Sequence, residues 1–192
     1  MRSISIAAAL LTALSAGSLA AQAPDSASDH SRHSPAGDQA LIANALSAAP
    51  PSVASTASVQ TMDGRTLRKG TSDWVCMPDM PDVPNNTPMC LDAEWRGVID
   101  AWMHKRPPTI KKIGFGYMLQ GDLPVSNTDP FATAPTSTNQ WIQNGAPHIM
   151  ILVPDPKLLE TISSDPSNGG PFVMWKGNPY AHLMVPTSPR EK

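Results

Sequence analysis

The chain has 192 residues, with 14 basic and 16 acidic side chains and a formal net charge of -2. A balance this close to neutral, without any run of basic residues, makes nucleic acid and anionic membranes poor candidates for partners. The length suits one domain with short extensions.

The first 23 residues have the layout of a secretory signal peptide. Arg2 provides a positive start, an apolar Ala/Leu run follows, and "LAAQA" at residues 19–23 offers small residues at cleavage spacing. This run is too short for a spanning helix, and no later stretch approaches ~18 consecutive apolar residues. We therefore expect a soluble exported protein, periplasmic or secreted, that loses residues 1–23 and has no transmembrane segment.

The next segment, residues 24–54, is rich in Ala, Ser and Pro and has no aromatic residue. A segment with so little to bury is expected to be a flexible lead-in. Within it, Leu41, Ile42 and Leu46 fall on one face of a short amphipathic helix. A single globular domain is expected over residues 55–188.

The domain begins with a hairpin signal and a pair of cysteines. Asp63-Gly64 lies between two strand-like runs, a pattern typical of a tight hairpin turn. Cys76 and Cys90 are the two cysteines of the chain and flank a proline-rich loop. In an oxidising compartment such a pair predicts a disulfide, and closing a short loop stabilises a fold by about 3 kcal/mol.

The clearest helix is "LDAEWRGVIDAWMHK". Asp92 is a suitable N-cap, and Trp95, Val98, Ile99 and Trp102 recur at helical spacing. After it, "KKIGFGYMLQG" reads as a strand whose glycines let another group approach closely.

The last third of the chain contains two more strand patterns. "PHIMILV" reads as a buried strand followed by a short helix, and "GPFVMW-KGNP-YAHLMV" reads as a hairpin with a four-residue turn. Taken together, the patterns predict an α+β fold: a mostly antiparallel sheet of about six strands, two or three helices and one disulfide.

His-x-Met occurs twice, each time in a strand that ends in Val-Pro. Because alternate strand residues share a face, His148 lies with Met150, and His182 with Met184, opposite an aliphatic face in each strand. We expect the aliphatic face to be core, and the His/Met face to be a second packed layer or a pocket wall. Imidazole and thioether together suit copper(I), so adjacent strands would make these four residues a soft-metal site. Ordinary packing of buried Met and His remains the alternative.

Two further functions remain open. A small hydrolase or isomerase would use His148 or His182 as general base, with Asp129 and Tyr180 among the candidate partners. However, the chain has no nucleophile elbow, no H-E-x-x-H and no P-loop. Asp129 before a proline is typical of a turn, and Tyr180 of a strand residue with a hydrogen-bonded hydroxyl. A structural or accessory protein without a site is the third interpretation.

Four stretches carry a resemblance: "DWVCMPDMPDVPNNTPMC", "SNTDPFAT", "PHIMILVPDP" and "GGPFVMWKGNPYAHLMVP". Together they resemble a group of small exported bacterial proteins for which no activity is established. The resemblance covers about Gly64 to Pro186 and implies one exported domain. It implies no cofactor, partner or site residue.

Overall fold

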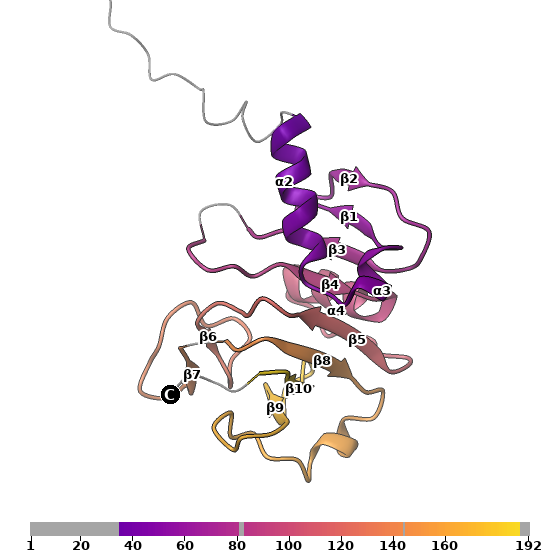
Figure 1. Ribbon diagram of the computed structural model, residues 1–192. Coiled ribbons are helices and arrows are strands. Elements are labelled where there is room, and N and C mark those ends of the chain that lie inside the picture. The colour runs from indigo at the N-terminus through magenta and orange to yellow at the C-terminus, as the bar shows by residue number, and fades with distance from the viewer. Residues whose placement is uncertain (1–34, 81–82, 144, 189–192) are drawn as a thin grey trace, which may run out of the picture.

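The structure is a computed structural model that describes residues 35–80, 83–143 and 145–188 (Figure 1). The expected signal peptide and the first part of the expected lead-in lie outside these residues. None of the helices in the described ranges has the length and apolar content that crossing a membrane requires.

The described ranges contain three α-helices, one 3-10 helix and two sheets. The helices are α2 (Pro35–Leu46), α3 (Pro51–Ala54), α4 (Ala93–Met103) and the 3-10 helix η1 (Pro156–Leu159). The strands of the large sheet are β1 (Ser58–Gln60), β2 (Thr66–Arg68), β3 (Val75–Met77), β4 (Met89–Leu91), β5 (Gly114–Met118), β8 (His148–Leu152), β9 (Phe172–Met174) and β10 (His182–Pro186). Strands β6 (Val125–Ser126) and β7 (Trp141–Ile142) form the small sheet.

The large sheet has eight strands in the order β2-β1-β3-β4-β5-β8-β10-β9. β1 and β3 run parallel, and every other pair of neighbours is antiparallel. The α+β prediction is confirmed, but the prediction of about six strands was too low. Strands β4, β6 and β7 have only two or three residues each. Segments this short show no alternation of apolar and polar residues that would reveal them in the sequence.

Helix α4 covers one face of the sheet, as the pattern of its apolar residues predicts. The Asp92 carboxylate accepts a hydrogen bond from the Trp95 backbone N–H at 2.9 Å and so caps the helix. The Trp95 indole donates to the Met150 carbonyl at 3.1 Å. A Cβ at Gly116 would lie 3.4 Å from Trp95 and 2.8 Å from the Met150 methyl carbon. The absence of a side chain at Gly116 therefore makes room for Met150 in the core beneath α4, as expected for a glycine within a strand.

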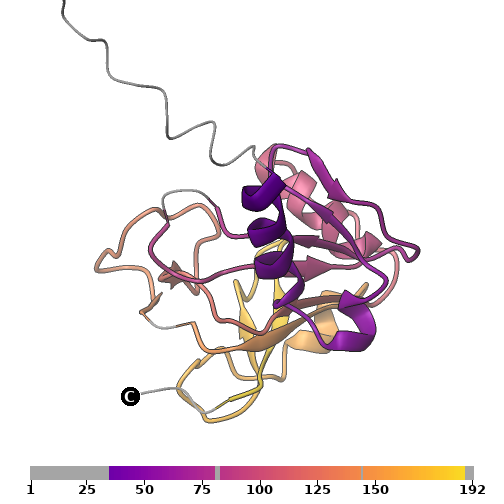
Figure 2. The same cartoon turned by 45° about the horizontal axis from the view of Figure 1, so that its top comes forward.

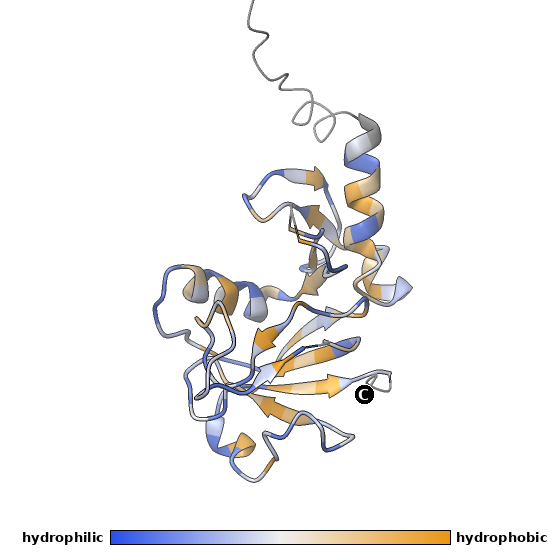
Figure 3. Cartoon of the chain, turned by 90° about the vertical axis from the view of Figure 1, so that its left-hand side faces the viewer, coloured by the Kyte–Doolittle hydropathy of each residue, from blue (hydrophilic) through white to orange (hydrophobic). Residues whose placement is uncertain are grey.

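Helices α2 and α3 pack onto the sheet and correct the expectation of a flexible lead-in for residues 35–54. α2 lies against the β1–β4 end of the sheet (Figure 1, Figure 2). Ala45 and Ala48 are fully buried against Val59 and the two cysteines. Because alanine side chains are small, the helix approaches the sheet closely although it has few large apolar residues. Figure 3 shows α2 and α4 on either side of the β1–β4 strands.

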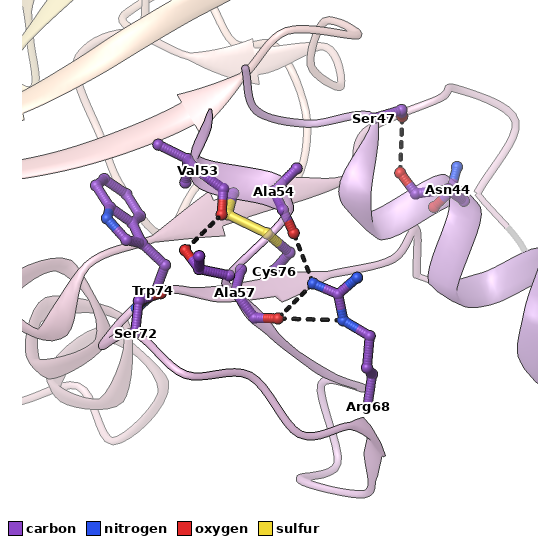
Figure 4. Close-up of a disulfide and its surroundings, with 11 residues drawn as sticks. Asn44, Ser47, Val53, Ala54, Ala57, Arg68, Ser72, Trp74 and Cys76 are labelled. Atoms are coloured by element: carbon purple, nitrogen blue, oxygen red, sulfur yellow. Dashed lines mark hydrogen bonds between the residues drawn. A yellow bond between two sulfur atoms is a disulfide. The ribbon is translucent and has the colours of Figure 1, made fainter. Parts of the chain in front are cut away.

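The predicted disulfide joins Cys76 of β3 to Cys90 of β4, which are directly opposite each other with their Cα atoms 3.9 Å apart. Both cysteines are fully buried. Near the bond, the Arg68 guanidinium donates to the carbonyls of Ala54 and Ala57, each at 2.6 Å (Figure 4). These two bonds tie β2 to the last residue of α3 and to the chain that follows it.

This burial predicts that the disulfide is protected in the native protein. A thiolate must reach a sulfur atom for exchange to occur, and α2 covers that approach. We expect native protein treated with a mild excess of dithiothreitol and then alkylated to keep its unmodified mass. The same treatment in strong denaturant should label both cysteines. Rapid double labelling without denaturant would show that α2 leaves the sheet readily.

Candidate metal-binding site

The face that carries the His-x-Met residues is the main core, which reverses the expectation from the sequence. His148, Met150, His182 and Met184 are all buried. Met150 and Met184 belong to the apolar cluster beneath α4. On the opposite face, Ile149 and the other aliphatic side chains of these two strands are mostly only half-buried. Helix α4 packs over the His/Met face, whereas the aliphatic face has cover from η1 only near Leu159.

The two His-x-Met strands are neighbours in the sheet and run antiparallel. Met150 pairs with Met184, and His148 pairs with Pro186. This register places the two histidines on opposite sides of the methionine pair, with an offset of four residues. At about 3.3 Å for each residue, their Cα atoms are about 13 Å apart along the strands. The two strands are adjacent, but the histidines are neither direct nor diagonal neighbours across them. They remain within electrostatic reach of each other, since the positive charge that His148 can carry contributes to lowering the pKa of His182.

Both histidines make the same local contact. His182 Nδ1 lies 3.0 Å from the Tyr180 carbonyl oxygen, and His148 Nδ1 lies 2.7 Å from the Ala146 carbonyl oxygen. Because a carbonyl oxygen only accepts, each Nδ1 donates its proton to the carbonyl two residues earlier. The neutral ring then carries its lone pair on Nε2. Repeating the sequence motif thus repeats a local geometry.

His182 lies between two tryptophan rings. The ring centroids are 4.9 Å from Trp95 and 5.1 Å from Trp175, with interplanar angles of 83° and 77°. His182 is 1% exposed, and its Nε2 has no hydrogen-bond partner among the described residues. Burial lowers the pKa of His182 to about 4, against the opposing effect of its hydrogen bond to Tyr180. At neutral pH the buried ring is therefore uncharged, with a bare lone pair.

Met174 is the residue at this site that sequence reasoning missed. It pairs with His182 across β9 and β10. The predicted four-residue turn at 176–179 would place Met174 opposite Ala181 instead. The observed connection spans residues 175–181, with left-handed backbone at Trp175 (φ 54°) and Gly177 (φ 82°). Only Gly177 signalled a left-handed residue in the sequence, because tryptophan rarely adopts that conformation.

Met150 belongs to the pair on the sheet but leans away from His182. Its methyl carbon lies 2.8 Å from the point where a Gly116 Cβ would be, over the neighbouring strand β5. By register, the thioethers placed beside His182 are therefore Met174, directly opposite, and Met184, two residues along the same strand. His182, Met174 and Met184 are called the His182 cluster below.

The candidate catalytic partners have other roles. The Asp129 carboxylate is exposed and accepts from the Phe131 backbone N–H at 2.9 Å, as a turn residue does. The Tyr180 hydroxyl is buried and donates to the Arg106 carbonyl at 2.8 Å. Neither the Asp129 carboxylate nor the Tyr180 hydroxyl is hydrogen-bonded to His148 or His182.

A cavity of about 450 Å³ lies on the other face of the sheet. Its lining includes Leu159 of η1, Val173 of β9 and Ala181. Val173 and Ala181 immediately precede Met174 and His182 in the chain, and alternate strand residues point to opposite faces. The cavity is therefore separate from the His182 cluster.

The described residues contain no group of three or more His, Cys, Asp or Glu side chains that could hold a metal ion. A metal on this face would therefore rely on the thioethers beside the imidazoles. Comparisons with known proteins add nothing to this geometry: no protein-family model, no curated protein and no solved structure matches the chain.

Proposed function

We propose that this protein is an exported soft-metal-binding protein that holds copper(I) at the His182 cluster. The observation that carries the proposal is the Nε2 lone pair of His182, which is buried without a hydrogen-bond partner among the described residues. Leaving a buried polar atom unsatisfied costs about 1–3 kcal/mol, and a bound metal ion would remove that cost. Metal-bound histidines almost always donate their other ring N–H to a carbonyl or carboxylate, as His182 does to Tyr180.

The donor types select the ion. Thioether and imidazole are neutral donors, and soft thioethers favour copper(I) over magnesium or calcium. The described part of the chain offers no carboxylate-rich alternative. The rings of Trp95 and Trp175 meet the His182 ring at close to a right angle and surround it with apolar, aromatic side chains.

Two observations support an exported location for this function. The Cys76–Cys90 disulfide fits an oxidising compartment, where such bonds persist. The layout of residues 1–23 is typical of a secretory signal, and the resemblance to small exported bacterial proteins points the same way.

Copper(I) titration against a competing chelator tests the proposal. Ascorbate should keep the copper reduced, since it avoids thiols that would compete for the ion. We expect Met174→Leu and Met184→Leu each to lower the copper(I) affinity at least tenfold, because each removes one of three donors. Leucine nearly preserves methionine's volume, so the fold should lose less than about 1.5 kcal/mol.

The matched control is Met103→Leu, because Met103 is a methionine of α4 with 49% exposure. This variant should bind copper(I) as the natural chain does. Unchanged affinity in both cluster variants would reject the copper site at His182.

A structural role is the second candidate, and the sealing of the cluster favours it. Met174 and Met184 are 3% and 5% exposed, so an ion reaches them only when the side chains that cover them move. In a purely structural protein the cluster is packing alone. The copper titration separates the two candidates, since packing predicts no binding in any variant.

A further inference from the structure

The surroundings of the two His-x-Met repeats are related by a local two-fold axis through the Met150–Met184 pair. Antiparallel pairing at this register exchanges β8 with β10. It also exchanges their outer neighbours, β5 and β9. His182 pairs outward with Met174, and His148 pairs outward with Met118. Both histidines therefore have a methionine directly opposite on the outer strand.

The two-fold relation also applies to the second methionine beside each histidine. Each histidine has a second methionine two residues along its own strand: Met184 for His182, and Met150 for His148. The methyl of Met150 leans over Gly116, toward the strand that carries Met118. Directly opposed strand residues have Cβ atoms about 5 Å apart, within the reach of a methionine and a histidine that bind one ion. His148, Met118 and Met150 are called the His148 cluster.

The second cluster is also buried and lies near a carboxyl group. Met118 and His148 are both almost fully buried. Burial raises the pKa of Asp122, and the positive charge that His148 can carry lowers it. Asp122 is therefore within electrostatic reach of His148.

We propose that the chain binds a second soft-metal ion at the His148 cluster. This second site rests on the proposed function, because both sites bind the ion through imidazole and thioether donors. The residues that supply these donors are different. The repetition of His-x-Met in the sequence then has a physical meaning: each copy supplies the imidazole and one thioether of its own site. The neighbouring strand supplies the other thioether.

The test is the stoichiometry of copper(I) bound by the full chain, measured by native mass spectrometry under ascorbate with excess chelator. Imidazole nitrogen spectra of ¹⁵N-labelled protein at pH 7 should be recorded beside it, since copper(I) is diamagnetic. Two double variants are compared with the natural chain: Met118→Leu with Met150→Leu, and Met174→Leu with Met184→Leu. Met103→Leu again serves as the control.

We expect two ions on the natural chain and on the control, and one ion on each double variant. The Nε2 resonance of His148 should move only when Met118 and Met150 are intact, and that of His182 only when Met174 and Met184 are intact. A single ion that persists in the Met118/Met150 variant, with the His148 resonance unmoved, would overturn the second site and leave the proposed function standing. A single ion lost only in that variant would support the second site and reject the assignment to His182. Binding of no ion would overturn both.

Discussion

A chain that starts at Ser55 is expected to unfold at least about 10 °C below the full-length chain. The truncation removes α2 and α3 and so uncovers Val59 and both cysteines, which are fully buried in the intact protein. It also removes Asp38, which accepts two hydrogen bonds from the Arg65 guanidinium at 3.0 Å. For a domain of this size, 1 kcal/mol corresponds to about 2–4 °C, so the expected loss is about 3 kcal/mol or more.

The matched control is a chain that starts at Ser34, because it keeps all of α2 and α3. Thermal unfolding followed by circular dichroism should give this chain the same midpoint as the full-length chain. If the chain starting at Ser55 also melts within a few degrees of the full-length chain, then α2 contributes little to stability. In that case the contacts between these alanines and the sheet would not stabilise the fold.

The packing of helix α2 against the sheet could not be predicted from the amino-acid composition of residues 35–54. The buried alanines are Ala45 in the helix and Ala48 in the turn after it, and they give no strong apolar pattern in the sequence. Alanine favours helix intrinsically, but it is equally common in flexible Ala/Ser/Pro segments. The helix packs against Val59 and the two cysteines, which the pairing of β1, β3 and β4 brings together.

Helix α4 and the two His-x-Met strands were predictable because their side chains are large and periodic. Trp95 and Val98 define a face that can only be buried, and the alternation around His148 fixes which residues share a side. The sequence was less clear about which side of the sheet α4 covers. The glycines of β5 indicate the covered side. Gly114 and Gly116 lie on the same face of the sheet as Met150, and their lack of side chains leaves space on that face for bulky residues.

The partners of the His182 cluster depend on register, which local pattern does not specify. One extra residue in the β9–β10 connection moves Met174 from opposite Ala181 to opposite His182. Such a shift exchanges every cross-strand neighbour, so a site built from opposed strands cannot be read from residue spacing alone. The equal phase of the two histidines was visible in the sequence, but their separation by four residues was not.

The protein is expected to lose stability as the pH falls from about 6.5 to about 4, because the buried His182 must then accept a proton. Burial lowers its pKa to about 4 in the folded state, against an ordinary value of 6.5. Between these values the unfolded chain binds a proton that the folded chain does not, so the free energy of unfolding rises with pH. A difference of about 2.5 in pKa corresponds to about 3 kcal/mol, which is fully lost below the folded pKa.

Asp122 acts in the opposite direction and must be separated from His182. Burial raises its pKa above 3.8 in the folded state, so the folded chain holds that proton more tightly than the unfolded chain. Its contribution to stability is present at low pH and is lost as the pH rises through the raised pKa. Asp122→Asn should therefore steepen the overall loss of stability on acidification.

His182→Leu isolates the histidine, because it removes the titrating ring and nearly keeps its volume. Urea unfolding at pH 7, 5.5 and 4, without metal, should show that this variant loses about 3 kcal/mol less than the natural chain between pH 7 and 4. The variant's stability at pH 7 alone does not decide the question, since leucine also changes the packing between Trp95 and Trp175. The change with pH does decide it, because packing is common to all three measurements. Parallel pH profiles for the two proteins would mean that His182 accepts a proton in the folded state as readily as in the unfolded chain. Such a ring would be in contact with water. The Nε2 atom of His182 would then not be buried without a partner, and the main support for the copper site would be lost.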